Sequence, residues 1–251
     1  MSETLARATA PDQAADPHRH GDHVHAPDGH DGHDHHKGLA HHFETYDQQR
    51  ESSSLGMWLF LVTEIMFFGG MFLVYTLYRG QNPTAFAAGS HELDIKLGVI
   101  NTAILIGSSL TMALAVRAGQ LGKSKAIVGF LVATIVLGGA FLGIKSVEYS
   151  HKFHEHVVPG ENFAFTGEGK FVGVDEGGVE MFFSIYFAMT GTHALHMVIG
   201  IVIMLFMLLP AWRGKWDENN HNFVEGFGLY WHFVDIVWIF LFPLLYLLGR
   251  H

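Results

Sequence analysis

Ionisable side chains lie inside the long apolar runs of this 251-residue chain. Glu64 lies in the first run, His193 and His196 lie in the fourth, and His232 and Asp235 lie in the last. A charged side chain at the centre of a bilayer costs on the order of 3 kcal/mol or more, so each of these residues needs a partner or a function. Carboxylates and imidazoles can move protons, and imidazoles can also bind metals and haem iron.

The spacing of these residues limits what they can do. His193 and His196 are three positions apart and project from one helix face, as do His232 and Asp235. A His–Asp pair can fix an imidazole tautomer for a metal ligand or a proton shuttle, and His193 with His232 could ligate a haem from two helices. We favour hydrogen bonds between helices. The expected polar network consists of His193, His196, His232, Asp235, Asn101 and Glu148.

Glu64 has two interpretations of equal weight. It lies close to the middle of its apolar run, where a carboxylate can relay protons. It can equally be a hydrogen-bonding group that joins two helices.

Five apolar runs must position these side chains. Each run has roughly 20 residues or more, enough to cross about 30 Å of hydrocarbon as a helix. Helices satisfy their own backbone hydrogen bonds in lipid, so we predict an all-α polytopic membrane protein with a bundle of five transmembrane helices. The predicted helices are 53–78, 94–117, 125–148, 180–210 and 223–249 within a membrane domain of residues 43–251.

Basic residues predict the orientation of the bundle. Arg117, Lys123 and Lys125 surround the second connection, and Arg213 and Lys215 lie in the fourth. The positive-inside rule puts both connections in the cytoplasm. The N-terminus is then also cytoplasmic, and the C-terminus lies on the outer, periplasmic side of the membrane.

Residues 1–42 form a His-rich segment of low complexity, which we expect to be a disordered cytoplasmic tail. Metal buffering is one interpretation, because imidazole binds Zn, Cu and Ni. We favour a solvated tail without a metal, because the irregular spacing fixes no coordination geometry. The candidate ligands would be His18, His20, His23, His25, His30, His33, His35 and His36.

Composition excludes several classes of site. The chain has no cysteine, which excludes disulfides, thiolate copper sites and iron–sulfur clusters within it. The formal net charge of −9 argues against nucleic-acid binding, which needs a basic surface.

Several motifs occur together, in an order that is typical of one family. The first run places Glu64 in the pattern W-F---E--FF, the fourth carries TGTHALHMVIG from Thr190, and the last carries YWHFVDIVWIFL from Tyr230. Asn101-Thr102 fits the second helix of the same family. Over roughly residues 50–249 the sequence resembles subunit III of cytochrome c oxidase.

This resemblance implies a non-catalytic subunit of an aa3-type cytochrome c oxidase in the bacterial inner membrane. Haem and copper would lie in subunits I and II, cytochrome c would donate electrons to the complex, and this chain would hold no cofactor. Packed on subunit I, the chain would support proton uptake and protect the oxygen-reducing centre.

The family also implies roles for particular residues. Glu64 matches a carboxylate that reacts with carbodiimides, and Arg213 falls where the family has a lipid-contacting arginine. We expect structural phospholipids near Arg213, Trp231, His221 and Glu225. The long form of the family has seven helices with a lipid cleft beside the first two. This chain has five predicted helices, so that cleft is absent or is completed by another subunit.

Three alternatives stay open. The complex could be a quinol oxidase or a nitric-oxide-reductase-associated assembly, because the electron donor binds elsewhere. The chain could instead be a proton-coupled transporter that uses Glu64 and Asp235, although we find no inverted repeat. It could also be a haem-carrying membrane cytochrome.

Overall fold

The computed structural model describes residues 46–161, 163–167, 169–213 and 222–250. These residues are mostly helical and include no β-strand. Five helices are long and apolar enough to cross a membrane, which confirms the predicted fold class. They are α1 (Tyr46–Gln81), α3 (Ile95–Gln120), α4 (Ser124–His154), α5 (Glu176–Trp212) and α6 (Asn222–Phe242), the last continued by the π-helical turn η2 (Pro243–Leu247).

The helices extend beyond the apolar runs, because helical hydrogen bonding continues into polar flanking residues. Side-chain caps mark the first residues of two helices: Asp94 accepts a hydrogen bond from the Lys96 backbone N–H before α3, and Asp175 accepts one from that of Gly178 before α5. The last run differs from the single helix predicted, since α6 gives way at Pro243 to η2 and then to a short 3-10 turn, η3 (Leu248–Arg250). Proline has no N–H for the helical ladder, which accounts for the change.

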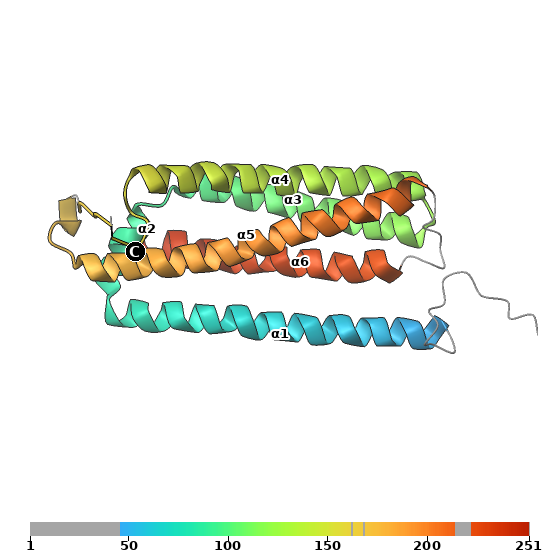
Figure 1. The fold of residues 1–251 in the computed structure, drawn as a ribbon, viewed down its shortest axis with the longest axis horizontal. Helices are drawn as coiled ribbons and strands as arrows, with labels where there is room; N and C mark the ends of the chain where they lie inside the picture. Colours follow the sequence, from blue (N-terminus) through green and yellow to red (C-terminus); the bar gives the residue numbers. More distant parts are fainter. Residues whose placement is uncertain (1–45, 162, 168, 214–221, 251) are drawn as a thin grey trace, which may run out of the picture. The chain divides into compact units, whose positions relative to one another are not determined.

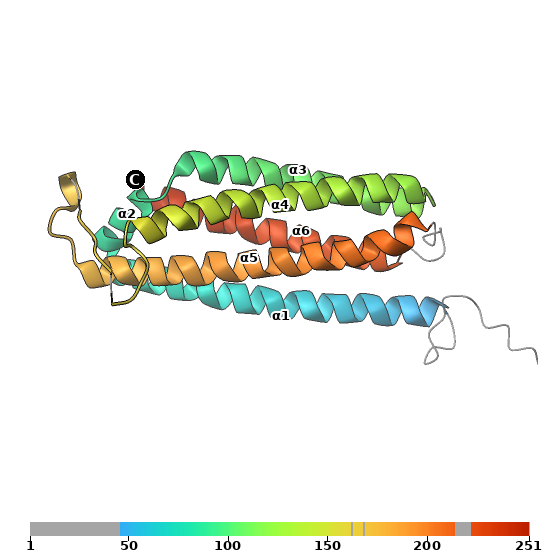
Figure 2. The ribbon, with the colours of Figure 1, turned by 45° about the horizontal axis from the view of Figure 1, so that its top comes forward.

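Helices α3, α4, α5 and α6 form a closed arrangement. The contacts run from α3 to α4, from α4 to α5, from α5 to α6 and from α6 back to α3. Helix α1 packs against α5 and α6 and lies along the outside of this group (Figures 1 and 2). Only 11% of the apolar segment of α1 is buried, against 56% for the last span, so α6 is the central helix and α1 is peripheral.

The core lies around α6 and is rich in large aromatic side chains. Trp231, Trp238 and Tyr246 are fully buried. Gly200 of α5 lets Trp231 approach closely, because a Cβ at that position would lie 2.7 Å from the Trp231 ring. The indole ring of Trp231 on α6 therefore packs closely against α5 at Gly200.

One further helix, α2 (Pro83–His91), follows α1 directly and had not been predicted. It packs against α5 and η3 at the end of the bundle that carries the C-terminus (Figure 1). At the same end, the Tyr75 hydroxyl donates to the Leu244 carbonyl at 2.7 Å, and Arg79 donates to the Leu248 carbonyl. These bonds attach α1 to the C-terminal turns.

Candidate functional site

Glu64 of α1 pairs with His196 of α5. The Glu64 Oε2 and His196 Nε2 atoms are 3.1 Å apart, and His196 Nδ1 lies 2.9 Å from the Thr192 carbonyl oxygen. A carbonyl oxygen only accepts, so Nδ1 carries a hydrogen. Nε2 then either accepts from a protonated Glu64 or donates, as imidazolium, to an ionised one. A hydrogen bond across this contact therefore needs one proton between Nε2 and Oε2.

Aromatic residues frame this pair without sealing it. The Phe68 ring lies 5.3 Å from the His196 ring, and the Tyr230 hydroxyl donates to the His196 carbonyl at 2.9 Å. The Glu64 side chain is 18% exposed and that of His196 is 13% exposed. The pair therefore lies close to the surface of the bundle.

A second polar cluster is fully buried near the His154 end of α4. Lys145 Nζ lies 3.1 Å from Glu148 Oε2, 3.1 Å from the Tyr186 hydroxyl and 2.8 Å from that of Tyr246. Both hydroxyls donate to Glu148 Oε1. The three ammonium hydrogens and both carboxylate oxygens are thus used, which is the condition under which a buried ion pair is tolerated.

Sequence patterns pointed to Glu148 but not to its partners. Lys145 lies in the same apolar run, three positions before Glu148, and Tyr186 and Tyr246 come from α5 and η2. A Lys and a Glu three positions apart on a helix were the available signal. The closed network holds α4, α5 and the C-terminal turn together. The ammonium hydrogens and carboxylate oxygens are all used within it and none is left to bind a substrate, so we interpret the network as structural.

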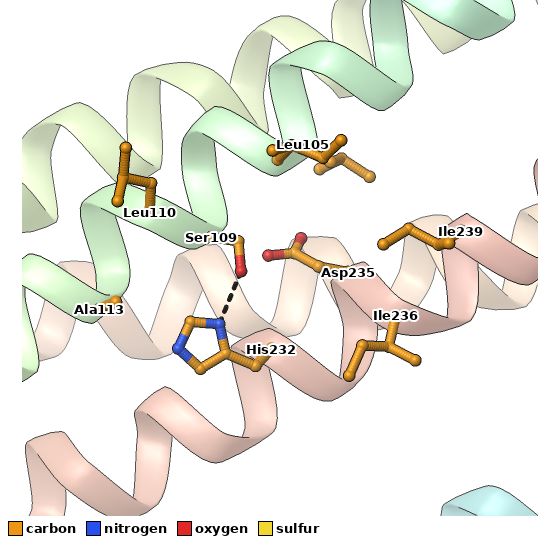
Figure 3. A pocket seen from close by; sticks show the side chains of 9 residues that line it. Leu105, Ser109, Leu110, Ala113, His232, Asp235, Ile236 and Ile239 are labelled. Atoms are coloured by element: carbon orange, nitrogen blue, oxygen red, sulfur yellow. Dashed lines mark hydrogen bonds between the residues drawn. The ribbon is translucent and has the colours of Figure 1, made fainter.

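His232 and Asp235 line one cavity but do not bond to each other. His232 Nδ1 shares a 2.7 Å hydrogen bond with the Ser109 hydroxyl of α3. Asp235 lies one turn further along α6, and its carboxylate points toward the same space (Figure 3). Both oxygens of Asp235 are buried, and the Ser109 side chain interacts with this carboxylate. His232 thus makes a hydrogen bond between helices, the interpretation that the sequence favours, and does not pair with Asp235.

His193 and Asn101 are buried and also differ from the expected network. Within the described part of the chain, neither side chain has a hydrogen-bond partner. The imidazole of His193 packs against the rings of Phe141 and Trp238, with centroids 5.5 and 5.3 Å away. Three separate polar groups, around Glu64, Glu148 and His232, therefore take the place of the single network expected.

The residues predicted to hold lipid are dispersed. Trp231 is fully buried and donates to Ser108 of α3 at 2.9 Å, which removes it from the surface. Glu225 accepts from Gln120 at 2.8 Å, and Arg213 is exposed at the C-terminal end of α5. His221 lies outside the described residues.

The proposed metal ligands of the N-terminal tail, His18 to His36, also lie outside the described residues. Within the residues that are described, no three His, Asp or Glu side chains come close enough to hold a metal ion.

Comparison with known proteins identifies relatives along most of the chain. The family model described as "Cytochrome c oxidase subunit III" matches residues 40–163 and 175–250. The cytochrome bo(3) ubiquinol oxidase subunit 3 of Pseudomonas aeruginosa is 30% identical over 229 residues, which cover 90% of this chain and 95% of that protein. The quinol oxidase subunit 3 of Bacillus spizizenii is 33% identical, and the match covers 78% of this chain and 86% of that protein. A probable cytochrome c oxidase subunit 3 of Nocardia farcinica is 31% identical, and the match covers 77% of this chain and 86% of that protein.

Proposed function

Because the chain belongs to the cytochrome c oxidase subunit III family, we propose that it is the non-catalytic third subunit of an aa3-type terminal oxidase in aerobic respiration. The observation that carries this proposal is the family match over residues 40–163 and 175–250, on a chain with five membrane-spanning helices. The relatives are named as oxidase subunits, which supports the setting. Their bacterial origin supports the plasma membrane of a bacterial cell as the location.

The partners in this proposal are the other subunits of the oxidase. Subunit I would hold the haem and copper of the oxygen-reducing centre and make the main contact with this chain. Subunit II would receive electrons from cytochrome c. Structural phospholipids would bind at the end of the bundle that carries Arg213, whose exposed side chain can meet a phosphate. In the proposed orientation this end faces the cytoplasm. The proposal includes no nucleic-acid partner.

Proton handling is the function proposed for Glu64 and His196. Their 3.1 Å contact can hold one shared proton, and both side chains are partly exposed. Either residue could pass a proton to a group on a neighbouring subunit. If another proton then replaces it, the net charge of the pair does not change. In this way the pair would support proton uptake by the oxidase and limit inactivation of the catalytic centre during turnover.

Quinol is the second candidate for the electron donor. Two of the relatives described above are named quinol oxidase subunit 3 or ubiquinol oxidase subunit 3, and one is named cytochrome c oxidase subunit 3. The donor would bind outside this chain, so its own residues do not separate the two.

The experiment that tests the proposal uses the complex purified through this chain. Reduced cytochrome c and ubiquinol are offered in turn while oxygen consumption is measured, and mass spectrometry identifies the other subunits. We expect a haem–copper subunit I, a copper-containing subunit II and turnover with cytochrome c. A complex that oxidises quinol alone would change the donor but not the family role. Purification without a haem–copper subunit would contradict the proposal.

A further inference from the structure

Two polar side chains inside the group formed by α3, α4, α5 and α6 have unpaired hydrogen-bonding atoms. His193 of α5 is 1% exposed and Asn101 of α3 is 0% exposed. Over the described ranges, both ring nitrogens of His193 and both amide atoms of Asn101 lack a hydrogen-bond partner. Burying a polar atom without a partner costs free energy, so native proteins pair nearly all such atoms with protein groups or with bound water.

The two residues lie in one layer across this group of helices. The indole nitrogen of Trp238 on α6 donates to the Thr102 hydroxyl of α3 at 3.1 Å. The Trp238 ring lies 4.8 Å from the ring of Phe141 on α4 and 5.3 Å from that of His193 on α5, measured between centroids. Asn101 directly precedes Thr102, so the two differ in level by about 1.5 Å along α3. His193 and Asn101 are therefore buried at the same depth, on α5 and α3.

Three polar side chains near His193 are already engaged elsewhere. Lys145 Nζ lies 5.0 Å from the centroid of the Trp238 ring, but all three of its hydrogens are used within the buried ion-pair cluster. Thr190, one turn before His193 on α5, makes two hydrogen bonds, and His196, one turn after it, uses both ring nitrogens. These neighbours leave the two nitrogens of His193 without a partner.

The unpaired atoms call for a small molecule that both donates and accepts. In its neutral form an imidazole has one donor and one acceptor nitrogen, and the Asn101 carboxamide also has a donor and an acceptor. A cation is disfavoured in this layer, because the Lys145 ammonium lies over the same indole ring. Water satisfies both kinds of atom, and a buried water typically makes about 3 hydrogen bonds to groups of this kind.

We propose that an internal water site lies in this layer, with His193 and Asn101 as its protein ligands. Water bridges the imidazole to the carboxamide and supplies the donor and the acceptor that each lacks. On α5 the site lies between Tyr186 of the buried ion-pair cluster and His196 of the proposed proton-handling pair. The site is inside the chain, so this inference does not depend on the proposed oxidase partners.

Radiolytic footprinting tests the site in the purified chain, together with the subunits that accompany it. Brief X-ray irradiation splits water, including water bound inside a protein, and the hydroxyl radicals oxidise neighbouring side chains. Met189 and Met197 are the probes, because each lies one turn from His193 on α5 and is 0% exposed. Met204 of the same helix is also 0% exposed and provides the matched control, about 16 Å from His193 along the axis.

We expect sulfoxide to form several times faster at Met189, Met197 or both than at Met204, because radicals arise beside the first two residues and not beside the control. Mass spectrometry of the irradiated protein measures the three rates. The comparison is made within one wild-type chain and needs no substitution. Equal rates at the three methionines would overturn the inference.

His193→Leu and Asn101→Leu identify the ligands of the water. Leucine approximates the shape of both side chains but forms no hydrogen bond, so each change should abolish the faster oxidation near position 193 and leave Met204 unaffected. Faster oxidation that persists in His193→Leu would overturn His193 as a ligand. Persistence in Asn101→Leu alone would remove Asn101 from the site.

Discussion

The hydrogen bond from His196 Nδ1 to the Thr192 carbonyl decides what the Glu64 pair can do. It orients the imidazole and commits one nitrogen, so only the other can form a hydrogen bond with Glu64. A lone carboxylate in a membrane helix would be costly, whereas a carboxylate paired with an imidazole is tolerated. The same arrangement that makes Glu64 acceptable in the bilayer also makes it able to exchange a proton.

Glu64→Gln separates hydrogen bonding from proton exchange. The amide still reaches His196 Nε2 but cannot accept and release a proton, so we expect normal assembly and a complex that loses activity sooner during continuous turnover. The measurement is oxygen consumption by the purified complex over many turnovers, beside wild type. An unchanged lifetime would assign Glu64 to helix packing alone.

Lys145→Met tests the buried ion pair. The substitution leaves Glu148 without its cation inside the protein, which we expect to lower the free energy of unfolding by about 3 kcal/mol. Changing both residues, Lys145→Met with Glu148→Leu, should be less damaging than the single change. SDS titration of the purified chain in micelles measures both, with exposed Lys96→Met as the control. A single variant as stable as that control would contradict this account of the cluster.

Sequence patterns located individual polar residues better than their contacts. Glu64 and His196 were both singled out, yet they are 132 positions apart and only the packing of α1 on α5 joins them. His232 and Asp235 share a helix face, but Ser109 of α3 binds the histidine. Spacing along one helix is visible in the sequence, whereas a contact between helices depends on which faces meet.

At the scale of helices, hydropathy predicts the five membrane spans but predicts neither α2 nor the end of α6. Lengths of about 20 apolar residues identify a membrane helix because the bilayer sets that length. The nine-residue helix α2 has no such constraint and was missed. The end of α6 depends on Pro243, whose effect is local.

The contact of α5 with α6 depends on Gly200. Gly200→Ala would place a Cβ 2.7 Å from a fully buried indole, so we expect a loss of about 2 kcal/mol in unfolding free energy. Gly139→Ala on α4 has no atom within 4 Å of the new methyl group and should be neutral or slightly stabilising. Parallel SDS titrations compare the two variants. Equal stabilities would show that the Trp231 ring has room to move.

At the scale of the whole molecule, the predicted orientation can be tested with introduced cysteines. Lys123→Cys lies in the turn between α3 and α4, and Glu161→Cys lies in the connection before α5. A maleimide that cannot cross membranes should label Glu161→Cys in intact cells, and should label Lys123→Cys only after the membrane is opened. The reverse pattern would invert the proposed orientation.

We propose that this chain belongs to a terminal oxidase and carries no redox centre itself. The most direct test of this claim is the visible absorption spectrum of the purified complex, recorded before and after this chain is dissociated from it. We predict that all haem absorption stays with the remaining subunits and that the separated chain, at equal protein concentration, shows no Soret band. A Soret band on the separated chain would contradict the claim.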